Sequence, residues 1–180
     1  MIKAICLIGP SASGKTAICE EALNAAPLLF GKVRTATTRN KRPNEKDDAY
    51  FFYSEKEFEE KMKQGQFLET SKYAGQFYGT HISSIQEIVS NGKTALVPID
   101  INGAIKYKTH FGNDVLIVFV YRDKDAVIRA IVERDIPIAE KSRRIMQLDS
   151  EYQLMNHCDR CIINNRSLTD AVELLKLFAR

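Results

Sequence analysis

The sequence predicts an α/β fold in which a parallel sheet is flanked by helices. Apolar runs of strand length alternate with helical patterns along most of the chain, which is typical of βαβ units. The runs at 95–99 and 115–120 contain almost no polar side chain, as expected for strands covered on both faces. The 180 residues suffice for one such domain and leave no room for a second catalytic domain.

The predicted core strands and helices follow from these patterns. The core strands are expected at 3–8, 33–35, 94–99, 115–120 and 161–163. The helices are expected at 15–25, 83–91, 103–110, 123–134, 139–155 and 168–179.

Residues 35–80 interrupt the alternation. Short segments at 50–53, 67–69 and 76–78 surround one helix, which Ser54 and Glu57 open with a capping-box pattern. No low-complexity segment or long linker separates this part from the rest. We therefore expect a small α/β insertion that belongs to the same folded unit.

Composition and charge exclude several classes of protein. Hydrophobic residues make up 44% and charged residues 27%, and no run approaches the roughly 20 apolar residues of a membrane span. A net charge of +3 is too small to indicate a nucleic-acid partner. Because the N-terminal residues already form a core strand, we expect no cleaved signal peptide. These observations predict a cytoplasmic protein without a membrane or nucleic-acid partner.

The four cysteines predict neither disulfides nor a metal site. Cys158 and Cys161 form a C-x-x-C pair beside His157, but a structural zinc site needs four ligands and no second pair has suitable spacing. We expect four reduced thiols, with Cys161 at the start of a buried strand.

The segment at residues 9–16 carries the strongest chemical signal. It reads G-P-S-A-S-G-K-T, follows the first apolar run and precedes the first helix, which is the context of a phosphate-binding loop. Glycines let the backbone curl so that its N–H groups and the helix N-terminus point at a polyphosphate. Lys15 would then reach the β- and γ-phosphates of ATP, and Thr16 would hold Mg²⁺.

The insertion contains groups suited to a second phosphate. Arg39 and Arg42 lie three residues apart in a loop stiffened by Pro43, and Tyr50 and Tyr78 lie at expected strand ends. Guanidinium groups bind phosphate through paired hydrogen bonds, and phenol hydroxyls add further donors. A solvated basic loop is the alternative interpretation.

Glu69 lies on a short strand between Leu68 and Thr70 rather than in a charged run. A carboxylate only accepts hydrogen bonds, and guanine offers two adjacent donors where adenine presents an acceptor. Glu69 therefore favours guanine, and the hydroxyls of Thr35 and Thr80 suit the same base.

Together these motifs resemble those of guanylate kinases, which convert ATP and GMP into ADP and GDP. The family's phosphate loop matches residues 9–16, and its T-T-R-x-x-R pattern matches Thr37, Thr38, Arg39 and Arg42. Its F-[LI]-E matches 67–69, its Y-G-[TS] matches 78–80, and its I-D-x-x-G matches Ile99, Asp100 and Gly103. The segment 159–164 resembles the one whose asparagine, here Asn164, lies by the adenine of ATP.

The resemblance implies a role for each matching residue. ATP would be bound by Gly9, Ser11, Ala12, Ser13, Gly14, Lys15, Thr16 and Asn164, and GMP by Thr35, Arg39, Arg42, Tyr50, Glu69, Tyr78, Thr80 and Asp100. Mg²⁺ would lie beside Thr16 and Asp100. The catalytic residues would be Lys15, Arg39, Arg134 and Arg144.

The resemblance also implies a division of labour along the chain. A P-loop kinase core would comprise 1–34, 81–133 and 145–180, with a GMP-binding insertion at 35–80 and a lid at 134–144. Both mobile parts would close over the nucleotides to exclude water before a direct in-line transfer. The partners would be ATP and GMP, and the protein would be a monomer or a homodimer.

Several positions depart from the family pattern. Thr35 stands where serine is usual, Thr70 replaces a tryptophan, Pro98 replaces an acidic residue, and the 42–50 loop is one residue shorter. The lid lacks the usual R-G-R-G-T-like stretch, although Arg134 with Arg143 or Arg144 would still clamp the transferred group. Two alternatives therefore stay open: a kinase of the same fold for another phosphorylated acceptor such as a ribose bisphosphate, and a non-catalytic binding module.

Overall fold

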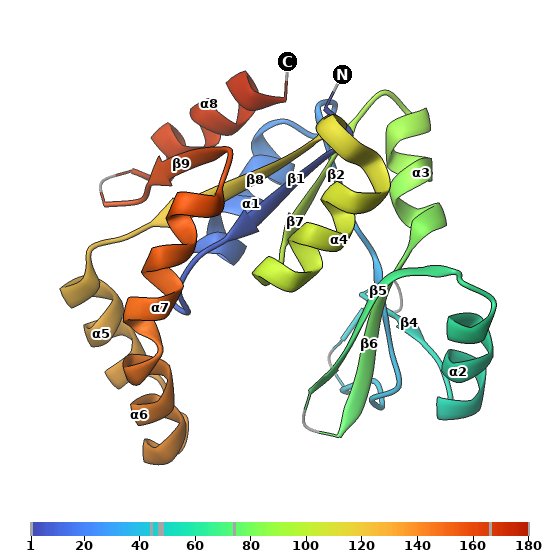
Figure 1. Ribbon diagram of the computed structural model, residues 1–180, viewed down its shortest axis with the longest axis horizontal. Coiled ribbons are helices and arrows are strands. Elements are labelled where there is room, and N and C mark those ends of the chain that lie inside the picture. The colour runs from blue at the N-terminus through green and yellow to red at the C-terminus, as the bar shows by residue number, and fades with distance from the viewer. Residues whose placement is uncertain (1, 44, 47–48, 74, 166, 180) are drawn as a thin grey trace.

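The computed structural model describes residues 2–43, 45–46, 49–73, 75–165 and 167–179 (Figure 1). The strands are β1 (Ala4–Ile8), β2 (Phe30–Lys32), β3 (Thr35–Thr37), β4 (Phe51–Phe52), β5 (Phe67–Tyr73), β6 (Gln76–His81), β7 (Thr94–Pro98), β8 (Val115–Tyr121) and β9 (Arg160–Ile163). The α-helices are α1 (Lys15–Ala25), α2 (Glu55–Lys63), α3 (Ile82–Ser90), α4 (Ile101–Phe111), α5 (Lys124–Val132), α6 (Ile138–Met146), α7 (Leu148–Gln153) and α8 (Leu168–Phe178). Short 3₁₀ helices lie at Gly112–Asp114 and Leu154–His157.

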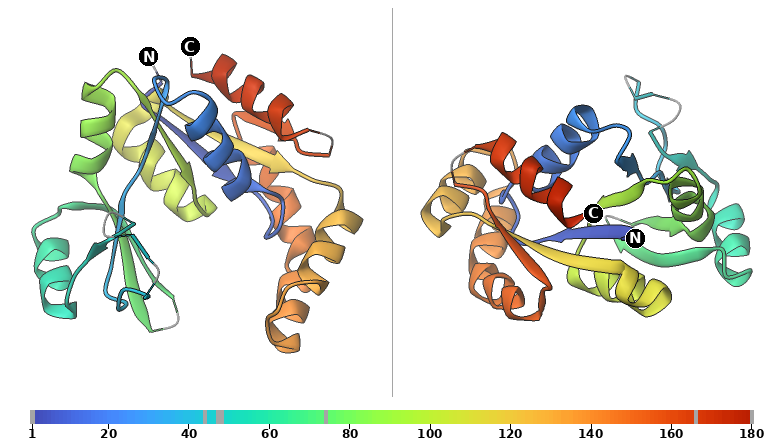
Figure 2. Two further views of the ribbon diagram at one scale, coloured as in Figure 1. Left: turned by 180° about the vertical axis from the view of Figure 1, so that it is seen from behind. Right: turned by 90° about the horizontal axis from the view of Figure 1, so that it is seen from above.

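The core is a five-stranded parallel sheet in the order β2-β7-β1-β8-β9. Successive side chains of β1 point to opposite faces, so Ile5 and Leu7 pack with α1 and α8. Ala4, Cys6 and Ile8 pack on the other face, against residues from α3 and α4. Figure 2 shows these helices on the two sides of the sheet, which confirms the predicted layered α/β architecture.

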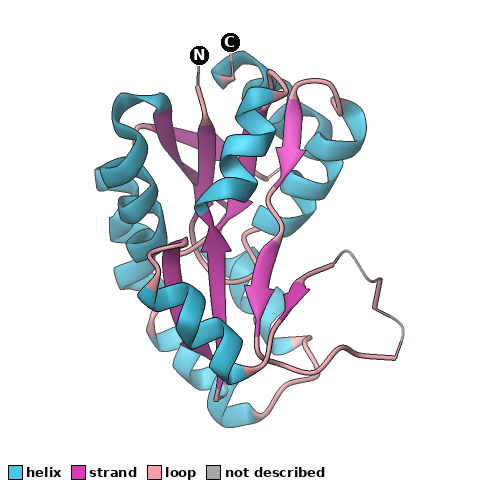
Figure 3. Cartoon of the chain, turned by 90° about the vertical axis from the view of Figure 1, so that its right-hand side faces the viewer, coloured by secondary structure: helices cyan, strands magenta, loops and turns pink. Residues whose placement is uncertain are grey.

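Residues of the predicted insertion form a second sheet in the order β4-β3-β6-β5. The two sheets lie one beyond the other when the molecule is viewed from the side (Figure 3). The buried Phe58 of α2 stacks on Phe67 and Phe77, with ring centroids 4.5 and 5.5 Å away, so α2 is fixed to this sheet. Ser54 and Glu57 form the predicted capping box at the start of α2.

The second sheet and the pair α5–α6 extend beyond the core on the same side of the molecule (Figures 1 and 2). The turn between β1 and α1 lies between them. This arrangement is consistent with the expected core, insertion and lid, whose boundaries and closure stay a prediction. Within the described ranges, no helix has both the length and the apolar character that crossing a membrane requires.

The predicted core strand at 33–35 is wrong. The core strand is Phe30–Lys32, whereas Thr35–Thr37 is the first strand of the second sheet. Phe30 is buried, and a Cβ on Gly31 would come within 2.5 Å of the side chain of Ile88 on α3. This strand therefore depends on close packing against a helix that is distant in sequence, and its glycine weakens the local strand signal.

The single helix expected at 139–155 is also wrong. The chain forms α6, then α7, then the 3₁₀ helix at Leu154–His157. The break at Gln147 lets Leu148 become fully buried against Val127 and Ile131, while Met146 stays 83% exposed. Tertiary burial thus overrides a helical periodicity that continues through the break.

The capping box gives a test of how α2 is stabilised. Ser54→Ala removes the hydroxyl that accepts from the Glu57 N–H at 3.2 Å, so the free energy of unfolding should fall by about 1 kcal/mol. Urea denaturation of the variant and the parent protein measures this difference. Ser90→Ala, at the exposed end of α3, is the matched control and should change stability by less than about 0.5 kcal/mol.

Candidate active site

The turn from β1 to α1 has the geometry of a phosphate-binding loop. Gly9 and Gly14 have φ angles of 138° and 97°, a region that glycine adopts without steric cost. A Cβ on Gly9 would lie 2.6 Å from the Val120 carbonyl oxygen, and one on Gly14 would lie 2.2 Å from the Asn164 amide nitrogen. The loop therefore requires glycine at both positions, at Gly9 because a backbone carbonyl of β8 approaches it directly and at Gly14 because of its positive φ.

Lys15 lies across this loop. Its Nζ donates to the carbonyl oxygens of Gly9 and Pro10 at 2.7 and 2.8 Å, and the side chain is half-buried rather than freely exposed. Burial lowers the pKa of Lys15 to about 8, an effect that Glu151 opposes and Arg134 reinforces. Thr16, in the first turn of α1, is exposed.

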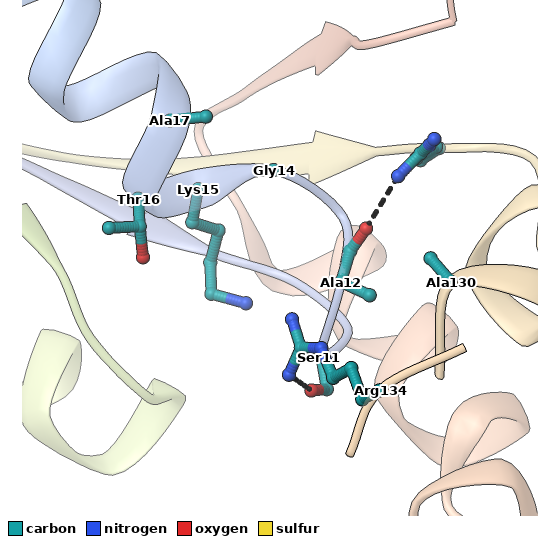
Figure 4. A pocket seen from close by; sticks show the side chains of 9 residues that line it. Ser11, Ala12, Gly14, Lys15, Thr16, Ala17, Ala130 and Arg134 are labelled. Carbon is teal, nitrogen blue, oxygen red and sulfur yellow. Dashed lines mark hydrogen bonds between the residues drawn. The ribbon is translucent and has the colours of Figure 1, made fainter. Parts of the chain in front are cut away.

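Two arginines from the predicted lid reach the same loop. The Ser11 hydroxyl accepts from Arg144 at 2.6 Å and from Arg134 at 3.3 Å, while Arg143 turns to Gln147. Glu140 holds Arg144 through hydrogen bonds of 3.1 and 2.5 Å. Figure 4 shows Arg134 at Ser11 beside the side chain of Lys15. The structure thus brings together three cations that the sequence places far apart.

Lys15 and Arg134 line a cavity of about 430 Å³. It is lined by Ser11, Ala12, Gly14, Lys15, Thr16, Ala17, Arg122, Ala130 and Arg134. Asn164 lies at the edge of the loop, where its side-chain amide donates to the Ser13 carbonyl at 2.8 Å. A concave, cationic site at a helix N-terminus is suited to a polyphosphate.

The second sheet brings together the residues expected to read a base. Thr35, Thr80 and Glu69 lie opposite one another on β3, β6 and β5. The Thr80 hydroxyl donates to Glu69 Oε1 at 2.7 Å, and burial raises the pKa of Glu69. This hydrogen bond occupies one carboxylate oxygen and fixes the orientation of the carboxylate.

The expected phosphate-binding residues lie on β6 and in the segment between β3 and β4. The rings of Tyr50 and Tyr78 meet edge to face with centroids 6.5 Å apart, and the Arg39 guanidinium lies 5.0 Å from the Tyr50 ring centroid. Arg42 is exposed, and its backbone N–H donates to Glu45 at 3.1 Å. The side chains of Arg39, Tyr50 and Tyr78 therefore form one cationic and aromatic cluster.

Asp100 caps α4 at the end of β7, where its Oδ1 accepts from the Gly103 N–H at 2.8 Å. Because β7 lies beside β1, this carboxylate is at the same sheet edge as the phosphate loop. The residues that the structure describes contain no cluster of three or more His, Cys, Asp or Glu side chains arranged for a metal.

The C-x-x-C pair lies outside the site. The Cys158 thiol donates to the Leu154 carbonyl, and the Cys161 thiol lies 3.9 Å from the Met155 sulfur. Cys161 is exposed on β9, so the expectation of a buried position for it is wrong. Its strand lies at the sheet edge, where one side lacks a neighbouring strand among the described residues.

Comparisons with known proteins agree with this geometry. A family model described as guanylate kinase matches residues 1–180. The guanylate kinase of Thermotoga maritima is 32% identical over 179 residues, which covers 97% of this chain and 84% of that protein. The guanylate kinase of Streptococcus pneumoniae is 33% identical over 160 residues, which covers 88% and 77% of the two chains.

This chain belongs to the guanylate kinase family. The crystal structure of the guanylate kinase from Anaplasma phagocytophilum superposes with a TM-score of 0.70 at 20% identity, covering 97% of this chain and 82% of that one. That likeness shows a shared fold. The resemblance inferred from the spaced motifs, and the α/β architecture with its second sheet, are therefore confirmed.

In this member of the guanylate kinase family, sequence reasoning missed the acidic residues beside the cationic groups, among them Glu45 and Glu151. Glu45 accepts from Arg39 at 2.8 and 2.5 Å, so its pKa is lowered to about 2 by that hydrogen-bonded pair. Glu151 lies beside Lys15, and burial raises its pKa. Glu45 follows the two arginines closely in sequence, which is a usable signal, whereas Glu151 comes close only through the fold.

The lowered pKa of Lys15 predicts a pH-dependent affinity for ATP. A bound triphosphate favours the charged amine, so binding should take up a proton and weaken as pH rises through about 8. Calorimetry of ATP with Mg²⁺ at pH 7, 8 and 9, in two buffers of different ionisation enthalpy, measures both effects. Lys15→Arg, charged throughout this range, should show no such proton uptake. A flat profile for the parent protein would contradict the prediction.

Proposed function

We propose that this protein transfers the γ-phosphoryl group of ATP to GMP, with Mg²⁺ as the metal. The main support is a cavity of about 360 Å³ that is lined jointly by Thr16, beside the phosphate loop, and by Thr35 and Tyr50 on the acceptor side. A donor and an acceptor bound at these two places would share one cavity. In-line phosphoryl transfer requires such a juxtaposition.

The cations of the site account for the catalysis in this proposal. Lys15, Arg134 and Arg144 would offset the charge on the moving phosphoryl group, and Arg39 and Arg42 would neutralise the acceptor phosphate that otherwise repels it. Little proton transfer is needed. The contacts of Arg134 and Arg144 with Ser11 support this role, because both arginines already lie at the loop.

Mg²⁺ fits the donor set at the same edge of the sheet. Thr16 offers an exposed hydroxyl and Asp100 a carboxylate, and oxygen ligands of this kind suit a small, hard cation that also binds phosphate. When bound, the ion would screen the charges of ATP. We propose these two residues as its protein ligands.

Base selection is assigned to Glu69. With Oε1 held by Thr80, the carboxylate is oriented to accept from the two adjacent N–H donors of guanine. Pro98, which replaces an acidic residue of the family pattern, is exposed and lines the shared cavity. For this reason another phosphorylated acceptor, such as a ribose bisphosphate, is kept as an outcome of the test.

An acceptor panel tests the proposed function. A coupled ADP-release assay with GMP, dGMP, IMP, AMP and a ribose bisphosphate should give the highest kcat/KM with GMP. Lys15→Ala should abolish transfer to every acceptor while leaving the fold intact. Activity that persists in this variant would come from a contaminating kinase. A preference for the ribose bisphosphate, or no transfer to any acceptor, would overturn the proposal.

Glu69→Gln tests how the base is read. The amide replaces one acceptor oxygen by a donor, so kcat/KM for GMP should fall. The expected loss corresponds to about 2–4 kcal/mol of transition-state stabilisation. ATP affinity should change little, and AMP should lose far less than GMP. Steady-state kinetics with both acceptors measure the difference. An equal loss for GMP and AMP would mean that Glu69 does not contact the base.

A further inference from the structure

Ala12 has an unusual conformation within the phosphate loop. Its φ is +67°, and it is the one non-glycine residue with positive φ in the described part of the chain. A side chain disfavours this left-handed region, because its Cβ crowds the following carbonyl oxygen. The methyl group of Ala12 packs against the apolar cluster of Val127, Ile131 and Leu148. A rotation of the backbone that relieved the strain would therefore cost this packing.

Arg122 contacts the backbone of this strained residue. Its Nη1 donates to the Ala12 carbonyl oxygen at 3.0 Å, the contact drawn as the dashed line that ends on Ala12 in Figure 4. A hydrogen bond from a charged donor is stronger than one between neutral groups. The contact therefore opposes rotation of the peptide group that joins Ala12 and Ser13.

The peptide group that follows Arg122 is itself held at both ends. Its carbonyl accepts a hydrogen bond from the Tyr152 hydroxyl. The next N–H, that of Asp123, donates to the Asn165 side chain at 2.9 Å. The backbone from which the Arg122 side chain extends is thus fixed directly after β8.

The other side of the same loop segment is also fixed. The Ser13 N–H donates to the Pro10 carbonyl at 3.1 Å, and the Ser13 carbonyl accepts from Asn164 at 2.8 Å. The peptide group that joins Ala12 and Ser13 is therefore held at both ends, at its N–H by Pro10 and at its carbonyl by Arg122. Without Arg122, that peptide group keeps only the contact of its N–H with Pro10.

We propose that Arg122 is a positioning residue for ATP binding, which acts by holding Ala12 in the left-handed conformation that the phosphate loop requires. The loop's N–H groups bind phosphate only when the backbone keeps this curl. The inference rests on the proposed function only in treating the loop as the ATP site. It does not depend on the identity of the acceptor.

A double-mutant cycle between the two residues tests the inference. The dissociation constant of ATP with Mg²⁺ is measured by calorimetry for the parent protein, Arg122→Ala, Ala12→Gly and the double variant, without acceptor. Arg122→Ala should weaken binding by about 10-fold, the loss expected for one charge-assisted hydrogen bond. In the Ala12→Gly background the same change should cost less than about threefold, because glycine adopts positive φ without help.

Two results would overturn the inference. An equal loss in both backgrounds means that Arg122 contacts the nucleotide directly and does not act through the loop conformation. No loss in either background means that the hydrogen bond is dispensable for ATP binding. Arg122→Met, which keeps the aliphatic stem, replaces Arg122→Ala if that variant does not fold, and the same 10-fold loss is expected. Arg129→Ala, an exposed arginine on α5, is the matched control and should leave binding unchanged.

A split between the two substrates separates this role from a general loss of structure. Arg122→Ala should raise KM for ATP while KM for GMP stays within about twofold of the parent value. The reason is that the residues proposed to bind GMP lie on and beside the second sheet. Since the binding cycle uses no acceptor, its outcome is independent of the acceptor panel. Failure to phosphorylate GMP would overturn the proposed function and leave this inference standing.

Discussion

The structure depends on close packing around the backbone of the loop between β1 and α1. The carbonyl of Val120 on β8 approaches Gly9 too closely for a side chain, and the side-chain amide of Asn164 lies against Gly14, whose positive φ also disfavours a side chain. The order of the parallel strands places these groups at one sheet edge. The loop is therefore shaped by the sheet as a whole, and its curl turns a strand-to-helix turn into a site for polyphosphate.

The charges around the loop follow from the same packing. Lys15, Arg134 and Arg144 approach one another, which is unfavourable unless acidic groups or an anion balance them. Glu140 and Glu151 supply part of that balance within the protein. We interpret the remaining positive charge as the attraction that a triphosphate would meet, with the donors already in position.

Much of the fold and part of the candidate site could be predicted from the sequence. Helix α1 begins and ends where predicted, because a phosphate-loop motif and a helical pattern both define it. The motifs at residues 37–42, 67–69 and 78–80 indicated residues that the second sheet brings together, among them the pair Glu69 and Thr80.

What the sequence did not predict depends on contacts distant along the chain. The strand β2 is stabilised by the close approach of Ile88 to Gly31, and the break before α7 by burial of Leu148. The contact of Arg122 with Ala12 joins residues 110 positions apart. Local patterns record propensity and periodicity, and they carry no record of which backbone carbonyl a distant arginine will reach.

The central claim is that ATP and GMP bind on facing walls of one site. Calorimetry with a bisubstrate analogue, in which adenosine and guanosine are joined by five phosphates, tests it most directly. The account predicts binding at least about 100-fold tighter than either ATP or GMP alone, because the second half binds at high effective concentration. Affinity no greater than that of the better single nucleotide would contradict it.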